Sequence, residues 1–234
     1  PLADSVAATF AAMSAMFAIY KRDQGGSGLG QVIDVSLHEP LFRLVESQVI
    51  GYDQLGIIKK RQGNRLAEDS PRNTYRTKDD EWIGVSASSQ KTFERLAEAI
   101  GMPELIADPR FVNNVERCAN ADVLDDFMAS WFVRHEKAEI MQLFDTLNVV
   151  AGPVLDISEI FQDPHYAARE SIVSVPDTDF GEVKMQGVVP KFSKNPGKVR
   201  YPGGALGQDN EEVFRDMLGL DETEFKRLKA LKVI

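Results

Sequence analysis

The sequence predicts an α/β protein. A helical run of small apolar residues over positions 6–20 leads through a glycine turn into a β-branched stretch at 31–37. Further along, two strand-like stretches enclose a polar turn, and several amphipathic helical stretches follow them. Helical and strand periodicities that alternate in one chain of 234 residues are typical of this class.

The first predicted helix opens at Asp4 and Ser5, whose side-chain oxygens can accept hydrogen bonds from first-turn N–H groups. Residues 6–20 are mostly alanine and other apolar types, which permit close packing, so we expect this helix to be buried on most sides. Glycines should end it, because glycine adopts positive φ without strain. They are Gly25, Gly26, Gly28 and Gly30. A buried strand is expected at residues 31–37, QVIDVSL.

The rest of the first stretch is predicted to be one helix and a loop. Apolar residues recur at helical spacing from about residue 39 to 51 or beyond. Residues 59–73 are polar and are broken by Gly63 and Pro71, which favours a linker or surface loop. Residues 1–73 are therefore predicted to be part of a large α/β domain.

A small α+β domain is predicted over residues 74–151. It begins with a β-hairpin that turns at Lys78, Asp79 and Asp80. Helices are then expected at residues 90–100 (closed by Gly101), 103–107, 120–134 and 137–147. Apolar faces of two of them should form the core. They comprise Phe93, Leu96, Ala97 and Ile100, and Val123, Phe127, Met128 and Trp131.

Residues 152–234 are predicted to return to the large domain. A short strand comes first, followed by a helix that Ser158 could cap. Residues 171–177 and 181–189 are expected to pair as strands around Asp179, Phe180 and Gly181. A final helix is expected near residues 209–218.

Composition excludes several classes of protein. The net charge of −9 argues against nucleic-acid binding. Cys118 is the only cysteine, which excludes an internal disulfide and a cysteine-rich zinc site and suits a reducing cytoplasm. The apolar run at 6–20 carries small side chains and is flanked by an acid and a base, so we expect a core helix, no membrane partner and no signal peptide.

Two other patterns do not indicate a binding site. GGSGLG at residues 25–30 follows a helix and precedes a strand, the reverse of the order in a dinucleotide-binding loop. His38, His135 and His165 are too scattered for a metal site, so no metal is predicted.

The strongest motif is at the start of the chain. Asp4, a helix of small residues to Arg22, a glycine turn and GQVIDVSLHE together resemble the signature of the class III CoA-transferases. That family includes formyl-CoA and carnitine CoA-transferases and α-methylacyl-CoA racemases. GPVLDISEIFQDPHYAARESIV and GEVKMQGVVPKFSKNPG resemble its C-terminal part, so the resemblance covers essentially the whole chain.

The resemblance implies a site and a reaction. Asp4 matches the aspartate that attacks the acyl-CoA carbonyl and forms an aspartyl-CoA intermediate, and Leu37 matches a position that lines the acyl pocket. The partners implied are an acyl-CoA, which is a substrate rather than a permanently bound cofactor, and a carboxylic acid acceptor. The fold implied is part of a nucleotide-fold-like large domain with an inserted small α+β domain.

Family members are also about twice as long and form interlocked homodimers. The chain begins with Pro1, which suggests a C-terminal portion that lacks the N-terminal, CoA-binding part of the same protein and that is inactive alone.

Two departures leave alternatives open. RLAEDSPRN and VSASSQ stand where formyl-CoA transferases have consecutive glycines over the site, so oxalate as acceptor is not favoured. The glycine turn after Arg22 is two residues longer than in the family pattern. Racemases use the matching aspartate as a proton-transfer base with a histidine from the preceding part, so an acyl-CoA racemase stays an alternative. A non-catalytic acyl-CoA-binding subunit is another.

Overall fold

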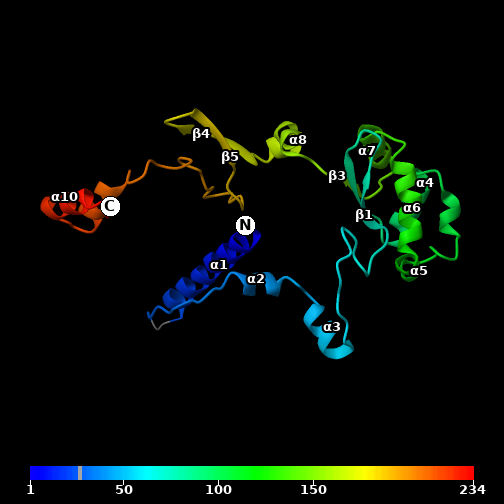
Figure 1. Cartoon of the computed structure of the whole chain (residues 1–234), viewed down its shortest axis with the longest axis horizontal. Helices are drawn as coiled ribbons and strands as arrows, with labels where there is room; N and C mark the ends of the chain where they lie inside the picture. Colours follow the sequence, from blue (N-terminus) through cyan, green and yellow to red (C-terminus); the bar gives the residue numbers. More distant parts are fainter. Residues whose placement is uncertain (26–27) are drawn as a thin grey trace. The chain divides into compact units, whose positions relative to one another are not determined.

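The structure is a computed structural model that describes residues 1–25 and 28–234 (Figure 1). The chain folds as two compact units, Pro1–Ser70 and Pro71–Ile234. Both helices and antiparallel sheets are present, which confirms the predicted α/β class. The finer division into residues 1–73, 74–151 and 152–234 stays a prediction.

The unit Pro1–Ser70 contains three helices among its described residues: α1 (Leu2–Gln24), α2 (His38–Arg43), which packs against α1, and α3 (Gln48–Leu55). The predicted cap at Asp4 and Ser5 is wrong. The backbone N–H of Ser5 already donates to the carbonyl of Pro1 at 3.1 Å, so Asp4 lies inside the first turn. The helix ends at Gln24, and Gly25 has a φ of −89°, not a positive one. Gly28 has a φ of +64°, while Gly26 lies outside the described residues.

The prediction that helix α1 is buried on most sides is wrong. Only Ala7 is buried, and Phe17 and Tyr20 are 65% and 71% exposed. Among the described elements, α2 is the one that packs extensively against α1, and most apolar side chains of α1 stay partly or largely exposed. By length and hydropathy alone, α1 also qualifies as a helix that could cross a membrane, a test that core helices of soluble proteins pass as well.

Two further predictions in this unit are wrong. Residues 31–37 form no strand, and Val32 is 96% exposed, because a strand needs a hydrogen-bonded neighbour and no described residue supplies one. The single helix from 39 to 51 is divided into α2 and α3 at Glu46, whose φ of +50° is incompatible with a continuous helix. Of the loop predicted over residues 59–73, residues 59–71 form no helix or strand, with one isolated bridge between Leu66 and Asp69, whereas Arg72 and Asn73 belong to a strand.

The unit Pro71–Ile234 begins with the predicted hairpin. Strands β1 (Arg72–Arg76) and β2 (Trp82–Ser86) pair antiparallel, with Tyr75 opposite Ile83. Strand β3 (Ala151–Pro153) adds to the free edge of β2, giving the order β1-β2-β3. The hairpin is confirmed because alternating apolar residues and turn-forming residues specify it locally.

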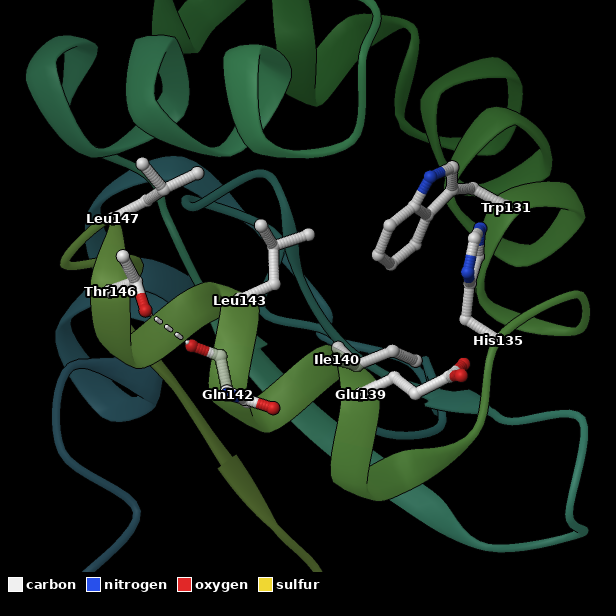
Figure 2. A pocket seen from close by; sticks show the side chains of 8 residues that line it. All are labelled: Trp131, His135, Glu139, Ile140, Gln142, Leu143, Thr146 and Leu147. Carbon is white, nitrogen blue, oxygen red and sulfur yellow. Dashed lines mark hydrogen bonds between the residues drawn. The ribbon is translucent and has the colours of Figure 1, made fainter.

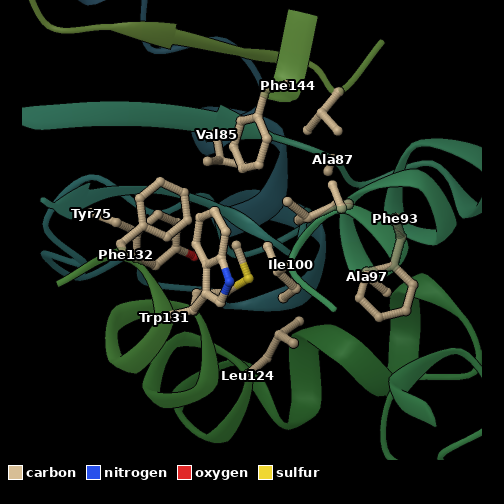
Figure 3. Close-up of a cluster of buried hydrophobic side chains, with 14 of the residues drawn as sticks. Tyr75, Val85, Ala87, Phe93, Ala97, Ile100, Leu124, Trp131, Phe132 and Phe144 are labelled. Atoms are coloured by element: carbon tan, nitrogen blue, oxygen red, sulfur yellow. The ribbon is translucent and has the colours of Figure 1, made fainter. Parts of the chain in front are cut away.

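Helices pack against this sheet in a single core (Figure 3). Their bounds are α4 (Gln90–Ala99), a 3₁₀ turn η1 (Pro103–Ile106), α5 (Asn114–Ala119), α6 (Ala121–Phe132) and α7 (Lys137–Thr146). The core contains the predicted face of α4, whose end is marked by Gly101 at a φ of +72°. On α6 the face is turned relative to the prediction: Leu124, Met128 and Trp131 are buried, whereas Val123 is 38% exposed. Helix α5 was not predicted.

The remaining elements are α8 (Ile157–Gln162), α9 (Pro164–Ala168), the hairpin of β4 (Ile172–Asp177) and β5 (Gly181–Gln186), a π-helical turn η2 (Glu211–Met217) and α10 (Glu222–Ala230). The hairpin confirms the predicted strand pair and its turn at Gly181, which has a φ of +76°. The cap of α8 is Asp156 rather than Ser158. The carboxylate of Asp156 accepts from the N–H of Glu159 at 2.9 Å, and the Ser158 hydroxyl donates to that carboxylate.

Candidate functional site

Asp4 lies in the first turn of α1 with an exposed side chain. No side chain caps this end of the helix, and the Ser5 hydroxyl donates to the carbonyl of Pro1 at 3.1 Å. The N–H groups of a first helical turn and the helix dipole favour a negative charge at this end. The Asp4 carboxylate therefore lies at the positive end of the α1 dipole and is exposed to solvent.

Leu37 lies immediately before α2, and its side chain is 55% exposed. The turn that carries it is held by Ser36, whose hydroxyl donates to the Glu39 carboxylate at 2.5 Å and accepts from the Glu39 N–H at 3.3 Å. The hydrogen bond from Ser36 lowers the pKa of Glu39. Because α2 packs against α1, Leu37 and Asp4 belong to the same compact unit. Their assignment as site residues stays a prediction.

The same unit contains a cavity of about 300 Å³, formed in part by the segment predicted as a loop. Residues from 44–48 and 59–68 line it, among them Lys59, which forms a 2.7 Å ion pair with Glu68. The hydrogen bond from Lys59 lowers the pKa of Glu68. This cavity was not predicted from the sequence, because its lining residues show no periodic pattern. The basic run KKRQGNR does indicate a polar surface.

A larger cavity of about 500 Å³ is lined by residues of α6 and α7 and of the turns that follow them (Figure 2). The Trp131 indole and the Leu143 side chain face each other across it, and Ile140 lies below them. The His135 ring lies 4.4 Å from the indole, centroid to centroid. Glu139 is occupied in a capping box, where its carboxylate accepts from the Glu136 N–H at 3.2 Å. The cavity offers apolar contact and hydrogen bonding, but its lining contains no cysteine, serine or lysine that could act as a nucleophile.

Over residues 1–25 and 28–234, no group of three or more histidine, cysteine, aspartate or glutamate side chains could hold a metal ion.

Known proteins resemble the chain along its whole length. The CoA-transferase family III model matches residues 1–210. The chain is 42% identical over 233 residues to the succinyl-CoA–D-citramalate CoA-transferase of Chloroflexus aurantiacus, and the match covers 100% of the chain and 58% of that protein. It is 32% identical over 234 residues to the succinyl-CoA–L-malate CoA-transferase alpha subunit of Chloroflexus aurantiacus, covering 100% of the chain and 54% of the subunit.

A solved structure shares the fold. A CAIB/BAIF family protein from Brucella suis superposes with a TM-score of 0.76 at 22% sequence identity, over 92% of this chain and 55% of that chain. The chain thus spans a little over half the length of the relatives that it matches. Because the family model matches residues 1–210 of the 234-residue chain, the chain belongs to the CoA-transferase family III.

Proposed function

We propose that the chain takes part in the transfer of CoA between an acyl-CoA thioester and a carboxylic acid, with Asp4 as the nucleophile. The observation that carries the proposal is the family match over residues 1–210, which includes Asp4 in the exposed first turn of α1. The names of the two Chloroflexus relatives, both succinyl-CoA-dependent CoA-transferases, support a thioester donor and a dicarboxylic or hydroxy acid acceptor.

The proposed reaction is covalent catalysis by a carboxylate. The Asp4 carboxylate attacks the thioester carbonyl, the C–S bond breaks, and CoA leaves as a thiolate, so that the acyl group and Asp4 remain joined as a mixed anhydride. The thiolate then attacks the aspartyl carbonyl, which releases the donor acid and leaves CoA bound to Asp4 as a thioester. The acceptor carboxylate and the thiolate repeat both exchanges in reverse, so the acceptor leaves as its CoA ester and Asp4 is restored.

The position of Asp4 supports this role physically. Asp4 lies in the first turn of α1, at the positive end of the helix dipole, which interacts favourably with negative charge. Oxyanions form at each tetrahedral step, and first-turn N–H groups are donors that can stabilise such charge. CoA itself is a substrate in this scheme, and no permanently bound cofactor is needed.

The exposed apolar surface of the first unit supports the proposal that another part of the protein covers it. Phe17 and Tyr20 on α1 and Val32 after it are all more than half exposed, an extent of apolar exposure that marks protein contacts. We therefore propose that the N-terminal portion that relatives of full length possess covers this surface and supplies the CoA groove, in an interlocked homodimer that acts in the cytoplasm. Alone, the chain should be inactive.

Substitution of Asp4 tests the proposal. In the full-length enzyme, Asp4→Asn should keep the fold, since asparagine is also tolerated in a first turn, but should reduce transfer below about a hundredth of wild type, because loss of covalent catalysis costs several kcal/mol. Asp23→Asn, at the other end of α1 in an exposed pair with Arg22, is the matched control and should retain activity. Transfer by Asp4→Asn above that level would exclude Asp4 as the nucleophile.

A further inference from the structure

The second unit contains a cavity bounded by α8, α9 and the β4–β5 hairpin, to which neither the sequence nor the proposed reaction assigns a role. Its volume is about 260 Å³. That volume is slightly below the ~300–1,000 Å³ of pockets for drug-sized ligands, so any occupant must be small. The residues that matter for its chemistry are Ile160, Phe161, Tyr166, Ile172, Ser174 and Lys184.

Local structure brings these side chains together. Ser174 and Lys184 are directly opposite each other in the β4–β5 register, so they share one face of the hairpin. Ile172, two residues before Ser174, lies on that face as well. The N–H of Ser171 donates to the carbonyl of Tyr166 at 2.9 Å, which fixes the end of α9 beside the start of β4.

The polar groups of this cavity have unused binding capacity. Among its described lining residues Lys184 is the only one with a charge, and its Nζ lies 5.5 Å from the centroid of the Phe161 ring. Within the part of the chain that the structure describes, no carboxylate forms an ion pair with Lys184, including its exposed neighbour Glu182. The hydroxyls of Tyr166 and Ser174 likewise make no hydrogen bond to another described residue.

This combination fits an anion with a short hydrocarbon part. The ammonium group of Lys184 and the two hydroxyls are donors, and charge-assisted hydrogen bonds to a carboxylate are the stronger kind. The Phe161 ring holds the ammonium near the cavity by a cation–π contact. Ile160 and Ile172 provide apolar wall that a fully hydrated anion such as phosphate could not use.

We propose that this cavity binds a short-chain carboxylate, with Lys184 holding the carboxylate group and the apolar wall receiving the hydrocarbon chain. The site goes beyond the proposed function: it uses no residue of the first unit, and its occupancy does not depend on chemistry at Asp4. Failure of one proposal therefore leaves the other standing.

Saturation-transfer NMR with butanoate on the 234-residue chain tests the proposal, because this method detects weak ligands even on associated protein. We expect saturable binding that Lys184→Met weakens roughly tenfold, the cost of losing a hydrogen bond to a charged group. Lys184→Arg should retain binding, because it keeps the charge. Lys194→Met, an exposed lysine that does not line the cavity, is the matched control and should bind as wild type does.

Two competition experiments define the ligand class. Neither 1-butanol, which has the hydrocarbon without the charge, nor inorganic phosphate, which has the charge without the hydrocarbon, should displace butanoate at equal concentration. Any of three results would overturn the proposal. They are wild-type-like butanoate binding by a Lys184→Met variant whose circular dichroism is native, the absence of saturable butanoate binding to the wild type, and displacement of butanoate by either competitor at equal concentration.

Discussion

Replacement of Arg117 by methionine should destabilise the second unit by about 3 kcal/mol. Arg117 lies on α5 with no exposed surface. Its guanidinium donates to the carbonyl of Ser88 at 2.6 Å, to the carbonyl of Phe111 at 3.1 Å and to the side chain of Gln90 at 2.9 Å. It also lies 4.5 Å above the Phe93 ring. One side chain therefore joins α5 to the start of α4 and to the loop before α5.

The magnitude follows from the groups that the substitution leaves behind. Methionine fills much of the same volume but donates no hydrogen bond, so two carbonyl groups lose a donor at ~1–3 kcal/mol each when buried. The exposed Gln90 amide can turn to water at little cost. Methionine also removes a charge whose burial is unfavourable, as shown by the lowered pKa of Arg117, for which desolvation is the main cause. That gain partly offsets the loss.

Urea unfolding monitored by tryptophan fluorescence measures this difference, since Trp131 lies in the same core. The matched control is Arg110→Met. Arg110 forms a 2.7 Å ion pair with Asp108 and lies 5.1 Å from the Phe111 ring, but its side chain is 48% exposed, so its loss should change stability by no more than ~0.5 kcal/mol. If Arg117→Met and Arg110→Met have equal unfolding free energies, the reasoning is refuted.

Three further predictions concern other parts of the chain. Tyr75→Phe should cost about 1–2 kcal/mol in urea unfolding, because the Tyr75 hydroxyl donates to the buried Asp125 carboxylate at 2.5 Å, and an unchanged midpoint would contradict this. The hydrogen bond from Lys137 lowers the pKa of Glu159 in the folded protein from its ordinary value of 4.5. The ionised Glu159 side chain therefore stabilises the fold fully above pH 4.5, and this contribution is lost as the pH falls through the lowered pKa. The free energy of unfolding of Glu159→Gln should therefore fall less steeply below pH 4.5 than that of the wild type, and parallel profiles of unfolding free energy against pH would contradict this. The 234-residue chain alone should bind an apolar dye, associate through the exposed faces of α1 and bind CoA poorly, whereas micromolar CoA binding in calorimetry would place the CoA groove within this chain.

The sequence was a good guide where local patterns determine structure. The β1–β2 and β4–β5 hairpins and helix α4 were predicted because alternation, turn residues and helical spacing all act over a few neighbouring residues. Helix α5 was missed because it is short and has no apolar periodicity, and its one buried residue is Arg117.

Where structure depends on distant partners, the sequence was a poor guide. Residues 31–37 have a strand-like composition, yet no described strand pairs with them, and pairing is what makes a strand. Apolar residues of α1 predicted burial, but burial requires a second surface. The site followed the same rule: Asp4 and Leu37 were found from motif position, whereas the cavities beside Trp131 and Lys184 are each lined by side chains from more than one element, and how those elements pack is not written in a local pattern.

The central claim, that Asp4 carries CoA during transfer, is tested most directly by mass spectrometry of its peptide. The full-length enzyme would be incubated with an acyl-CoA in deuterated buffer, without an acceptor acid, and treated with hydroxylamine or borohydride before digestion. The account predicts a hydroxamate or a reduced side chain at Asp4, and none in Asp4→Asn. Rapid deuteration of the substrate α-carbon with an unmodified Asp4 would contradict it, because the carboxylate would then act as a racemase base that only carries a proton.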